Sequence, residues 1–212
     1  MDNIKLQKPL LRGHFHQAFF YISLGATVLL LLKCQSLKNF IPVLIYSIAL
    51  LMMFGISALY HRIHWEPKAR YFMKRLDHAG IYIMIAGSFT PVTTIAMNSN
   101  EGEALLIKVW IFGCIGILQS IFFVNLPKWL SSILYLIMGF LILPYFQDLF
   151  MILGTLKLSL LILGGISYTI GAVAYGLKRP AFIPHIFGYH EFFHVMVCIG
   201  ATFHFALIYL IL

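Results

Sequence analysis

The sequence contains few charged residues and very few acidic ones. Only 10% of its 212 residues are charged, with 7 Asp and Glu against 15 Lys and Arg, whereas 61% are hydrophobic. Soluble domains are typically about a quarter charged and about half apolar. The composition therefore argues against a water-soluble globule and predicts an integral membrane protein.

Cysteine is also scarce. The three cysteines, Cys34, Cys114 and Cys198, lie far apart and form no C-x-x-C pair. This spacing suggests neither a disulfide framework nor a thiolate zinc site. The formal charge of +8 is interpreted as a membrane-topology signal, because the chain is so apolar, and no nucleic-acid partner is expected.

Long apolar runs are present along most of the chain. A helix needs about 20 apolar residues to cross a bilayer, and seven runs approach that length. We therefore predict an all-α, seven-transmembrane helix bundle formed by one domain, 1–212. No cleavable signal peptide is visible, so the first run is expected to remain as a span. The expected spans are 15–32, 41–60, 79–97, 105–124, 129–146, 158–177 and 192–212.

The Lys and Arg residues predict the orientation of these spans. Cytoplasmic segments of membrane proteins carry an excess of Lys and Arg. With a cytoplasmic N-terminus, eleven basic residues lie inside and only Lys33, Lys38, Lys108 and Lys157 lie outside. We therefore expect a multi-pass protein of the cell membrane with its N-terminus inside and its C-terminus outside. The inside residues are Lys5, Lys8, Arg12, Arg62, Lys68, Arg70, Lys74, Arg75, Lys128, Lys178 and Arg179.

Five polar residues are expected at one depth, in the inner leaflet. Ser57 and His61 are four residues apart at the end of the second span, Asp77 precedes the third, and His190 and His194 open the seventh. The second span ends at the cytoplasmic face, and the other two begin there. Ionisable residues at membrane depth are rare and usually functional.

This set suits a zinc site. His190 and His194 lie about 6 Å apart along a helix axis, and His61 would complete a three-histidine site with an open fourth position. Asp77 would then act as general base or bond the metal's water, with Ser57 as a donor beside it. Each residue also has a simpler interpretation: His61 as an interfacial side chain, Asp77 as a helix cap and Ser57 as a packing residue.

The string His190-Glu-Phe-Phe-His194 also matches the H-E-x-x-H pattern, in which the glutamate is a metalloprotease base. Glu191 could instead favour the helix dipole in the first turn of a helix, and we rank it behind Asp77 as a base. His204 is about 15 Å further across the membrane than His194, so it is expected to be a buried polar contact. His78 would at best lie behind Asp77. The weakest candidates are the interfacial or loop histidines, His14, His16, His64 and His185.

At these residues the chain resembles the hemolysin III family, the bacterial branch of the progestin and adiponectin receptor superfamily. The matching segments are Ser57-Ala-Leu-Tyr-His61-Arg, Leu76-Asp77-His78-Ala-Gly-Ile-Tyr with the following Ile85-Ala-Gly-Ser-Phe-Thr-Pro91, and His190-Glu-Phe-Phe-His194 with His204.

The resemblance implies a seven-helix bundle with a cytoplasmic N-terminus. It also implies Zn²⁺ bound by His61, His190 and His194, with Asp77 and Ser57 near the metal's water. The superfamily includes alkaline ceramidases, which hydrolyse a lipid amide. The long N-terminal domain of the receptor branch is missing here, which counts against receptor signalling.

Three functions are therefore compared. The first is a zinc-dependent hydrolase of a lipid amide or ester, with membrane lipids as partners and substrate source. The second is a membrane-lytic protein, as the family name suggests, although no amphipathic span that could line a channel is visible. The third is a receptor-like membrane protein in which zinc only ties helices together. The substrate and the oligomeric state do not follow from the sequence.

Overall fold

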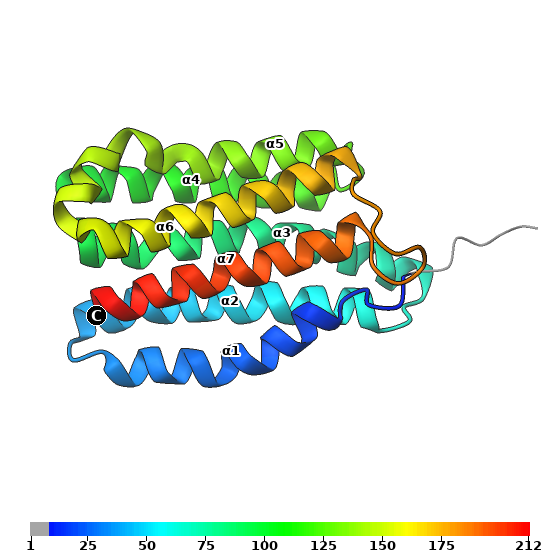
Figure 1. Cartoon of the computed structure of the whole chain (residues 1–212), viewed down its shortest axis with the longest axis horizontal. Coiled ribbons are helices and arrows are strands. Elements are labelled where there is room, and N and C mark those ends of the chain that lie inside the picture. Colours follow the sequence, from blue (N-terminus) through cyan, green and yellow to red (C-terminus); the bar gives the residue numbers. More distant parts are fainter. Residues whose placement is uncertain (1–8) are drawn as a thin grey trace, which may run out of the picture.

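The chain forms a bundle of helices running back and forth along one common direction (Figure 1). The computed structural model describes residues 9–212; Lys5 and Lys8, which enter the charge count above, lie outside them. Within the described range there are seven α-helices, a π-helical segment η1, a 3-10 segment η2 and no strand beyond one isolated bridge between Ile183 and Phe187. The elements are α1 His14–Lys33, α2 Leu37–Arg62, α3 Pro67–Pro91, η1 Val92–Met97, α4 Asn100–Phe122, α5 Lys128–Gly139, η2 Phe140–Tyr145, α6 Phe146–Leu177 and α7 Tyr189–Ile211.

Local sequence signals explain several helix starts. Ser36 caps α2 by accepting a hydrogen bond from the Asn39 N–H, and Ser99 caps α4 in the same way through the Gly102 N–H. Capping by serine satisfies an N–H that the first helical turn leaves without a partner. Pro67 opens α3, at the position where proline's missing N–H costs nothing.

The helices cover the predicted apolar runs, but the structure does not confirm seven separate spans, and several boundaries differ. Within residues 9–212, six continuous helical segments are long and apolar enough to cross a membrane, and one of them is the 50-residue stretch Lys128–Leu177. The sequence divides this stretch into two spans, 129–146 and 158–177. Gly154, at φ 67° and ψ 179°, interrupts the helical path inside it, and α5 and α6 lie side by side (Figure 1).

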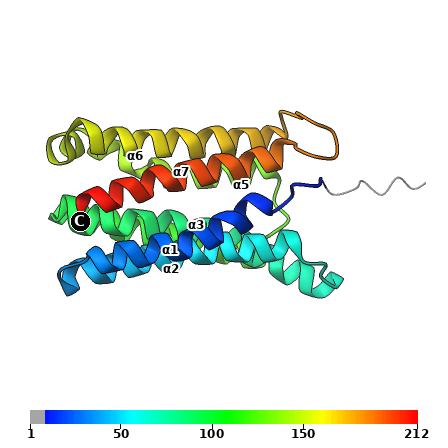
Figure 2. The same cartoon turned by 60° about the horizontal axis from the view of Figure 1, so that its bottom comes forward.

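The helices pack in layers around two apolar clusters. In Figure 2, α3 and α7 lie between α6 on one side and α1 and α2 on the other. One cluster joins α3, α4, α5 and α6 around Tyr82, Val109 and Met138. The other joins α1, α2 and α7 around Phe54. The end of the bundle where α1, α3 and α7 begin and α2 ends holds the polar residues considered below.

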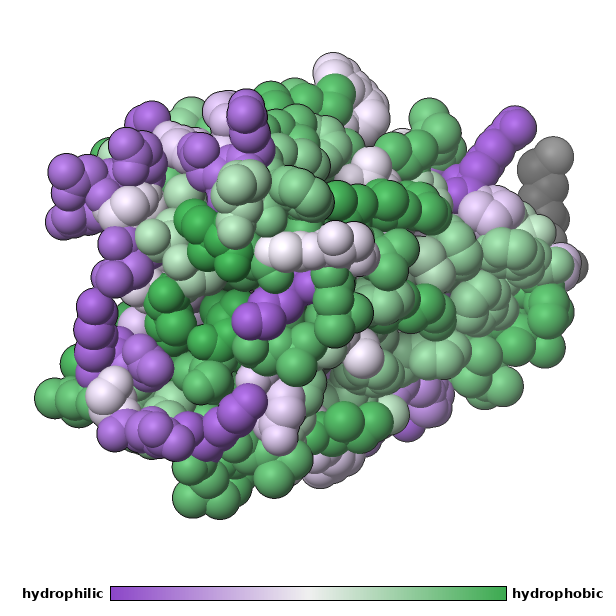
Figure 3. Space-filling view, turned by 60° about the vertical axis from the view of Figure 1, so that its left-hand side comes forward, coloured by the Kyte–Doolittle hydropathy of each residue, from purple (hydrophilic) through white to green (hydrophobic). Residues whose placement is uncertain are grey.

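The outer surface is also apolar. Many large hydrophobic side chains are exposed, among them Leu32 at 78% and Met151 at 79%. Figure 3 shows a face that is mostly hydrophobic, with hydrophilic side chains gathered mainly at its margins. Water-soluble proteins rarely expose apolar surface on this scale. Together with the apolar helices, this surface identifies a multi-pass membrane protein.

Candidate metal centre

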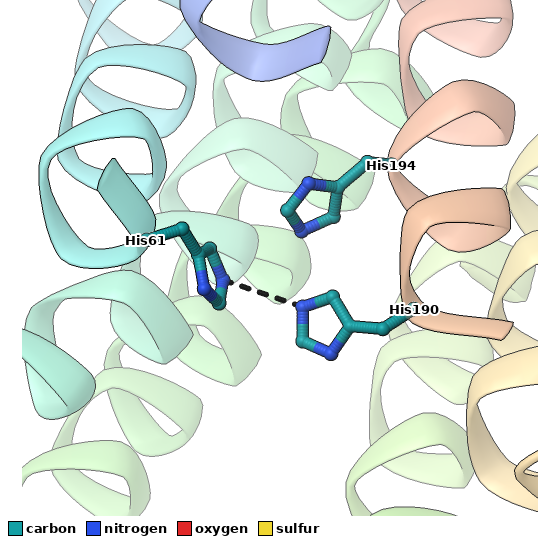
Figure 4. Close-up of side chains that lie close together, drawn as sticks. All are labelled: His61, His190 and His194. Carbon is teal, nitrogen blue, oxygen red and sulfur yellow. Dashed lines mark hydrogen bonds between the residues drawn. The ribbon is translucent and has the colours of Figure 1, made fainter. Parts of the chain in front are cut away.

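Three histidines converge between α2 and α7 (Figure 4). One ring nitrogen from each of His61, His190 and His194 lies within 4.8 Å of the others, an arrangement that could hold a metal ion. The Nε2 atoms of His61 and His190 are 3.3 Å apart. All three side chains are at most 9% exposed.

The donor set suits zinc. Zinc–imidazole bonds are about 2.0–2.1 Å long, which places two nitrogens of a tetrahedral site about 3.3 Å apart. The observed separation of His61 and His190 matches this value. The Nδ1 of His194 is buried without a hydrogen-bond partner in the described residues, and hydrogen bonding therefore does not explain why an imidazole stands there. Neutral imidazole is a ligand that zinc accepts readily, although it also suits other transition metals.

The helix geometry explains how these residues meet. His61 lies in the last turn of α2, and His190 and His194 lie in the first two turns of α7. Residues four apart occupy the same helix face, so both α7 histidines point toward α2. The sequence therefore predicted the juxtaposition correctly, because helix direction alone puts these turns at one end of the bundle.

Asp77 and Ser57 lie beside the histidines. The Asp77 Oδ2 is 3.7 Å from the His61 Nε2, and Ser57 lies next to the Asp77 carboxyl group. Asp77 lies inside α3, which begins ten residues earlier at Pro67. The helix-cap interpretation of Asp77 is therefore wrong. All five residues singled out from the sequence stand together, and their chemical roles remain predictions.

Glu191 has a structural position. Its side chain is fully buried, its Oε2 accepts the Gly188 N–H at 2.8 Å, and its Oε1 pairs with Arg12. Both carboxylate oxygens are thus engaged, one at the start of α7 and one at the start of α1. This arrangement disfavours Glu191 as a general base and makes it the link that holds α1 against α7.

Sequence reasoning missed His16. We expected it to be an interfacial residue, but it is only 2% exposed and its ring stacks on His194, with centroids 3.8 Å apart. Its Nδ1 lies 2.8 Å from the Ser57 Oγ. The depth argument could have found it, because α1 begins at the same end of the bundle as α3 and α7.

The other histidines stand away from the cluster or behind it. The His204 Nε2 contacts the Leu161 carbonyl oxygen at 3.3 Å, which is the expected polar contact, although the His204 side chain is half-buried and not fully buried. The His78 Nδ1 lies 2.9 Å from the Lys74 carbonyl oxygen and 3.8 Å from the Asp77 Oδ2. His64 and His185 are exposed and His14 is half-buried.

A cavity of about 480 Å³ extends from the histidines into the bundle. At one end it is lined by His190, His194 and Asp77, and it continues between α3, α6 and α7 as far as His204. Most of its lining is aliphatic or aromatic. Several lining side chains on η2 and α6 are also 43–48% exposed on the bundle surface, so there the cavity wall is a single layer thick. These side chains are Phe140, Leu143, Ile166 and Ile170.

Comparison with known proteins is consistent with this architecture. The model of the family described as "Haemolysin-III related" matches residues 4–205. Hemolysin-3 of Bacillus cereus is 30% identical over 187 residues, which cover 87% of this chain and 82% of that protein. The Hemolysin-3 homolog of Bacillus subtilis (strain 168) is 33% identical over 158 residues, covering 74% of this chain and 71% of the relative. The chain therefore belongs to the hemolysin III family.

Proposed function

We propose that this protein is a seven-span membrane hydrolase that uses zinc to cleave an amide or ester bond of a membrane lipid. The observation that carries the proposal is the meeting of three buried imidazoles and a carboxyl group at one end of a largely apolar cavity. Polar catalytic groups beside an apolar cavity suit a substrate with a polar head and a long hydrocarbon chain.

The proposed topology has the N-terminus in the cytoplasm and the site in the inner leaflet. Nine Lys and Arg between Arg12 and Arg179 lie at the end of the bundle that holds the histidines, against four at the other end. The positive-inside rule assigns the richer end to the cytoplasm. The long segment Lys128–Leu177 is counted as two spans, one formed by α5 with η2 and the other by the part of α6 beyond Gly154. With the other five helices, this gives seven spans.

The chain's own groups have distinct roles in this proposal. Zinc held by His61, His190 and His194 would supply Lewis-acid chemistry toward a carbonyl group. Asp77, next to His61, accepts a proton from the attacking water and returns it to the leaving group. Ser57 holds the Asp77 carboxyl group in place. The cavity holds the hydrocarbon chain and excludes bulk water from the reacting bond.

Replacement of Asp77 tests the hydrolase. In Asp77→Ala we expect hydrolysis of ceramide and phospholipid probes to fall by about 10²–10⁴-fold, the usual contribution of a general base. Bound zinc, measured by elemental analysis, should stay near the wild-type level because the three histidines are unchanged. Hydrolysis that survives this substitution would remove Asp77 from the mechanism.

The same preparations separate the alternatives. The relatives are named for hemolysis, and a lytic protein would release dye from vesicles whether or not His61 is replaced by alanine. A purely structural zinc would give tight metal binding without hydrolysis of any lipid probe. Leakage that requires both His61 and Asp77 would instead follow from lipid hydrolysis.

A further inference from the structure

The cavity also carries polar groups at the end away from the three histidines. Tyr168 of α6 and His204 of α7 both line it there, with ring centroids 5.2 Å apart and an angle of 76° between the ring planes. His204 follows His194 by ten residues, which is about 15 Å along the axis of α7. The rest of the lining is mostly aliphatic or aromatic. Two rings that can form hydrogen bonds therefore lie in an apolar part of the cavity.

Two glycines make room for these rings. A Cβ added to Gly164 of α6 would collide with the His204 ring, and a Cβ added to Gly200 of α7 would come within 2.7 Å of the Tyr168 ring. Gly164 and Tyr168 are one turn apart on α6, as Gly200 and His204 are on α7. Each ring thus lies against the backbone of the opposite helix, and α6 and α7 together fix the positions of both.

The His204 ring has one nitrogen that remains available to a ligand. Its Nε2 lies 3.3 Å from the Leu161 carbonyl oxygen, which can only accept a hydrogen bond, so the Nε2 carries a proton. In the neutral ring the Nδ1 is then an acceptor. Gly164 faces the edge formed by Nε2 and Cδ2, and Nδ1 is the ring atom opposite that edge. Within residues 9–212 the Leu161 carbonyl is the only hydrogen-bond partner of this ring.

The Tyr168 hydroxyl is buried and has no hydrogen-bond partner among the residues that the structure describes. The interior of a bilayer offers no water to such a group, and leaving it unpaired is costly. Gly200, which the ring contacts, is the central residue of α7, so this part of the cavity is far from both ends of the helix. A phenylalanine would fill the same space without that cost. Packing therefore does not account for a tyrosine here, whereas a ligand that pairs with its hydroxyl would.

We infer that this end of the cavity is a polar subsite for a lipid whose hydrocarbon chain carries a hydroxyl group. A hydroxyl both donates and accepts hydrogen bonds, so it can pair with the His204 Nδ1 and with the Tyr168 hydroxyl. An extended chain covers about 1.2 Å per bond, so the 15 Å between the two ends of the cavity corresponds to about twelve bonds. The choice of a lipid as ligand rests on the proposed hydrolase, whereas the polar groups of the subsite do not.

Competition binding tests the subsite without requiring turnover. Isotope-labelled stearic acid bound to detergent-purified protein is displaced by unlabelled stearic, 12-hydroxystearic or 2-hydroxystearic acid. In wild type we expect 12-hydroxystearic acid to bind about tenfold more tightly than stearic acid, the usual effect of one hydrogen bond. In Tyr168→Phe this preference should be largely lost. The hydroxyl of 2-hydroxystearic acid would lie beside the histidine cluster, so the affinity for this acid should be the same in both proteins.

Tyr46→Phe is the matched control. The Tyr46 hydroxyl is likewise buried without a partner in the described chain, but Tyr46 is not among the residues that line the cavity. Tyr46→Phe should therefore keep the tenfold preference. The acids partition differently into micelles, but this partition is the same for every variant, so the comparison isolates the effect of the protein. Without ligand, Tyr168→Phe should melt no lower than wild type, because the hydroxyl it removes has no partner.

Four results would overturn the inference. They are the absence of any binding, equal affinity of wild type for stearic and 12-hydroxystearic acid, an undiminished preference in Tyr168→Phe, and a preference lost equally in Tyr46→Phe. Hydrolysis measured on the same preparations decides the proposed function separately. Lipid hydrolysis together with equal affinities would reject the subsite alone, and a preference that depends on Tyr168 in a protein that hydrolyses no probe would reject the hydrolase alone.

Discussion

At the scale of single residues, Glu191 shows that a sequence motif can occur without its usual chemistry. In H-E-x-x-H metalloproteases the glutamate is a general base. Here both its oxygens are occupied, by the Gly188 N–H and by Arg12, and the side chain is fully buried. A buried carboxylate needs such partners, because removing it from water is costly. Glu191 therefore belongs to the helix packing around the site.

Replacing Glu191 should lower stability more than it lowers metal binding. In Glu191→Gln we expect the free energy of unfolding to fall by about 1–3 kcal/mol, at the lower end for a broken buried ion pair because Arg12 remains 20% exposed. Thermal unfolding in detergent measures this, with the exposed Glu103→Gln of α4 as control. A variant that is as stable as wild type but inactive would restore Glu191 as a candidate base.

The three-histidine cluster predicts that metal binding requires His194 but not His204. We expect about one zinc per chain in wild type and in His204→Ala, and loss of most of the metal in His194→Ala, since two ligands hold zinc much more weakly than three. Elemental analysis of purified, monodisperse protein measures it. Zinc lost equally from both variants would indicate that the metal is bound elsewhere or non-specifically.

The sequence was sufficient to bring five of these residues together, because depth follows from helix direction and span order. It did not identify His16, which looks interfacial when only its distance from the start of the apolar run is considered. The depth argument would have placed His16 at the correct end of the bundle, but its contact with His194 depends on the approach of α1 to α2 at Gly13. Tertiary contacts of this kind do not follow from hydropathy.

At the scale of elements, the helices extend beyond the apolar runs that predicted them. The third run begins at residue 79, whereas α3 begins at Pro67. The additional turns contain Lys68, Arg70 and Lys74, whose charges hide the helix from a hydropathy argument. The joined segment of α5, η2 and α6 is the opposite case, because the sequence predicts two separate spans, 129–146 and 158–177, whereas helical structure runs from Lys128 to Leu177 with an interruption at Gly154.

The contact between α1 and α2 depends on Gly13. Gly13→Ala would place a Cβ in the left-handed region, at a cost of about 1–2 kcal/mol, and against the His61 Cβ. We expect a lower melting temperature together with weaker zinc binding, as α1 displaces the end of α2. Gly25→Ala on the same helix has no atom within 4 Å of the added Cβ, and should be neutral or slightly stabilising. Equal zinc affinity in both variants would contradict this role for Gly13.

At the scale of the whole molecule, the two ends of the bundle differ in two ways. One end carries most of the Lys and Arg residues and also holds the histidine cluster. The described chain begins at the end that holds the histidines and finishes at the other (Figure 1). An odd number of passes is consistent with this arrangement. The sequence predicts a charge difference between the ends because Lys and Arg are unevenly distributed among the loops, and which end faces the cytoplasm stays a prediction.

Reagent accessibility tests this polarity. In a background without Cys34, Cys114 and Cys198, a thiol reagent that does not cross membranes should label Glu101→Cys in intact cells and should label Glu66→Cys only after the membrane is opened. The reason is that α3 begins beside Glu66 at the proposed cytoplasmic end, and α4 begins beside Glu101 at the other. The reverse pattern would invert the topology.

The thin wall between η2 and α6 affects how rates should be measured. Side chains such as Leu143 and Ile166 face the cavity and are also 47% and 48% exposed to the surroundings of the bundle. In the proposed hydrolase, a lipid substrate that passes between them would reach the histidines from the bilayer plane without entering water. Its effective concentration is then its mole fraction among the surrounding amphiphiles, so added detergent would slow turnover by surface dilution even when the number of substrate molecules per volume stays the same.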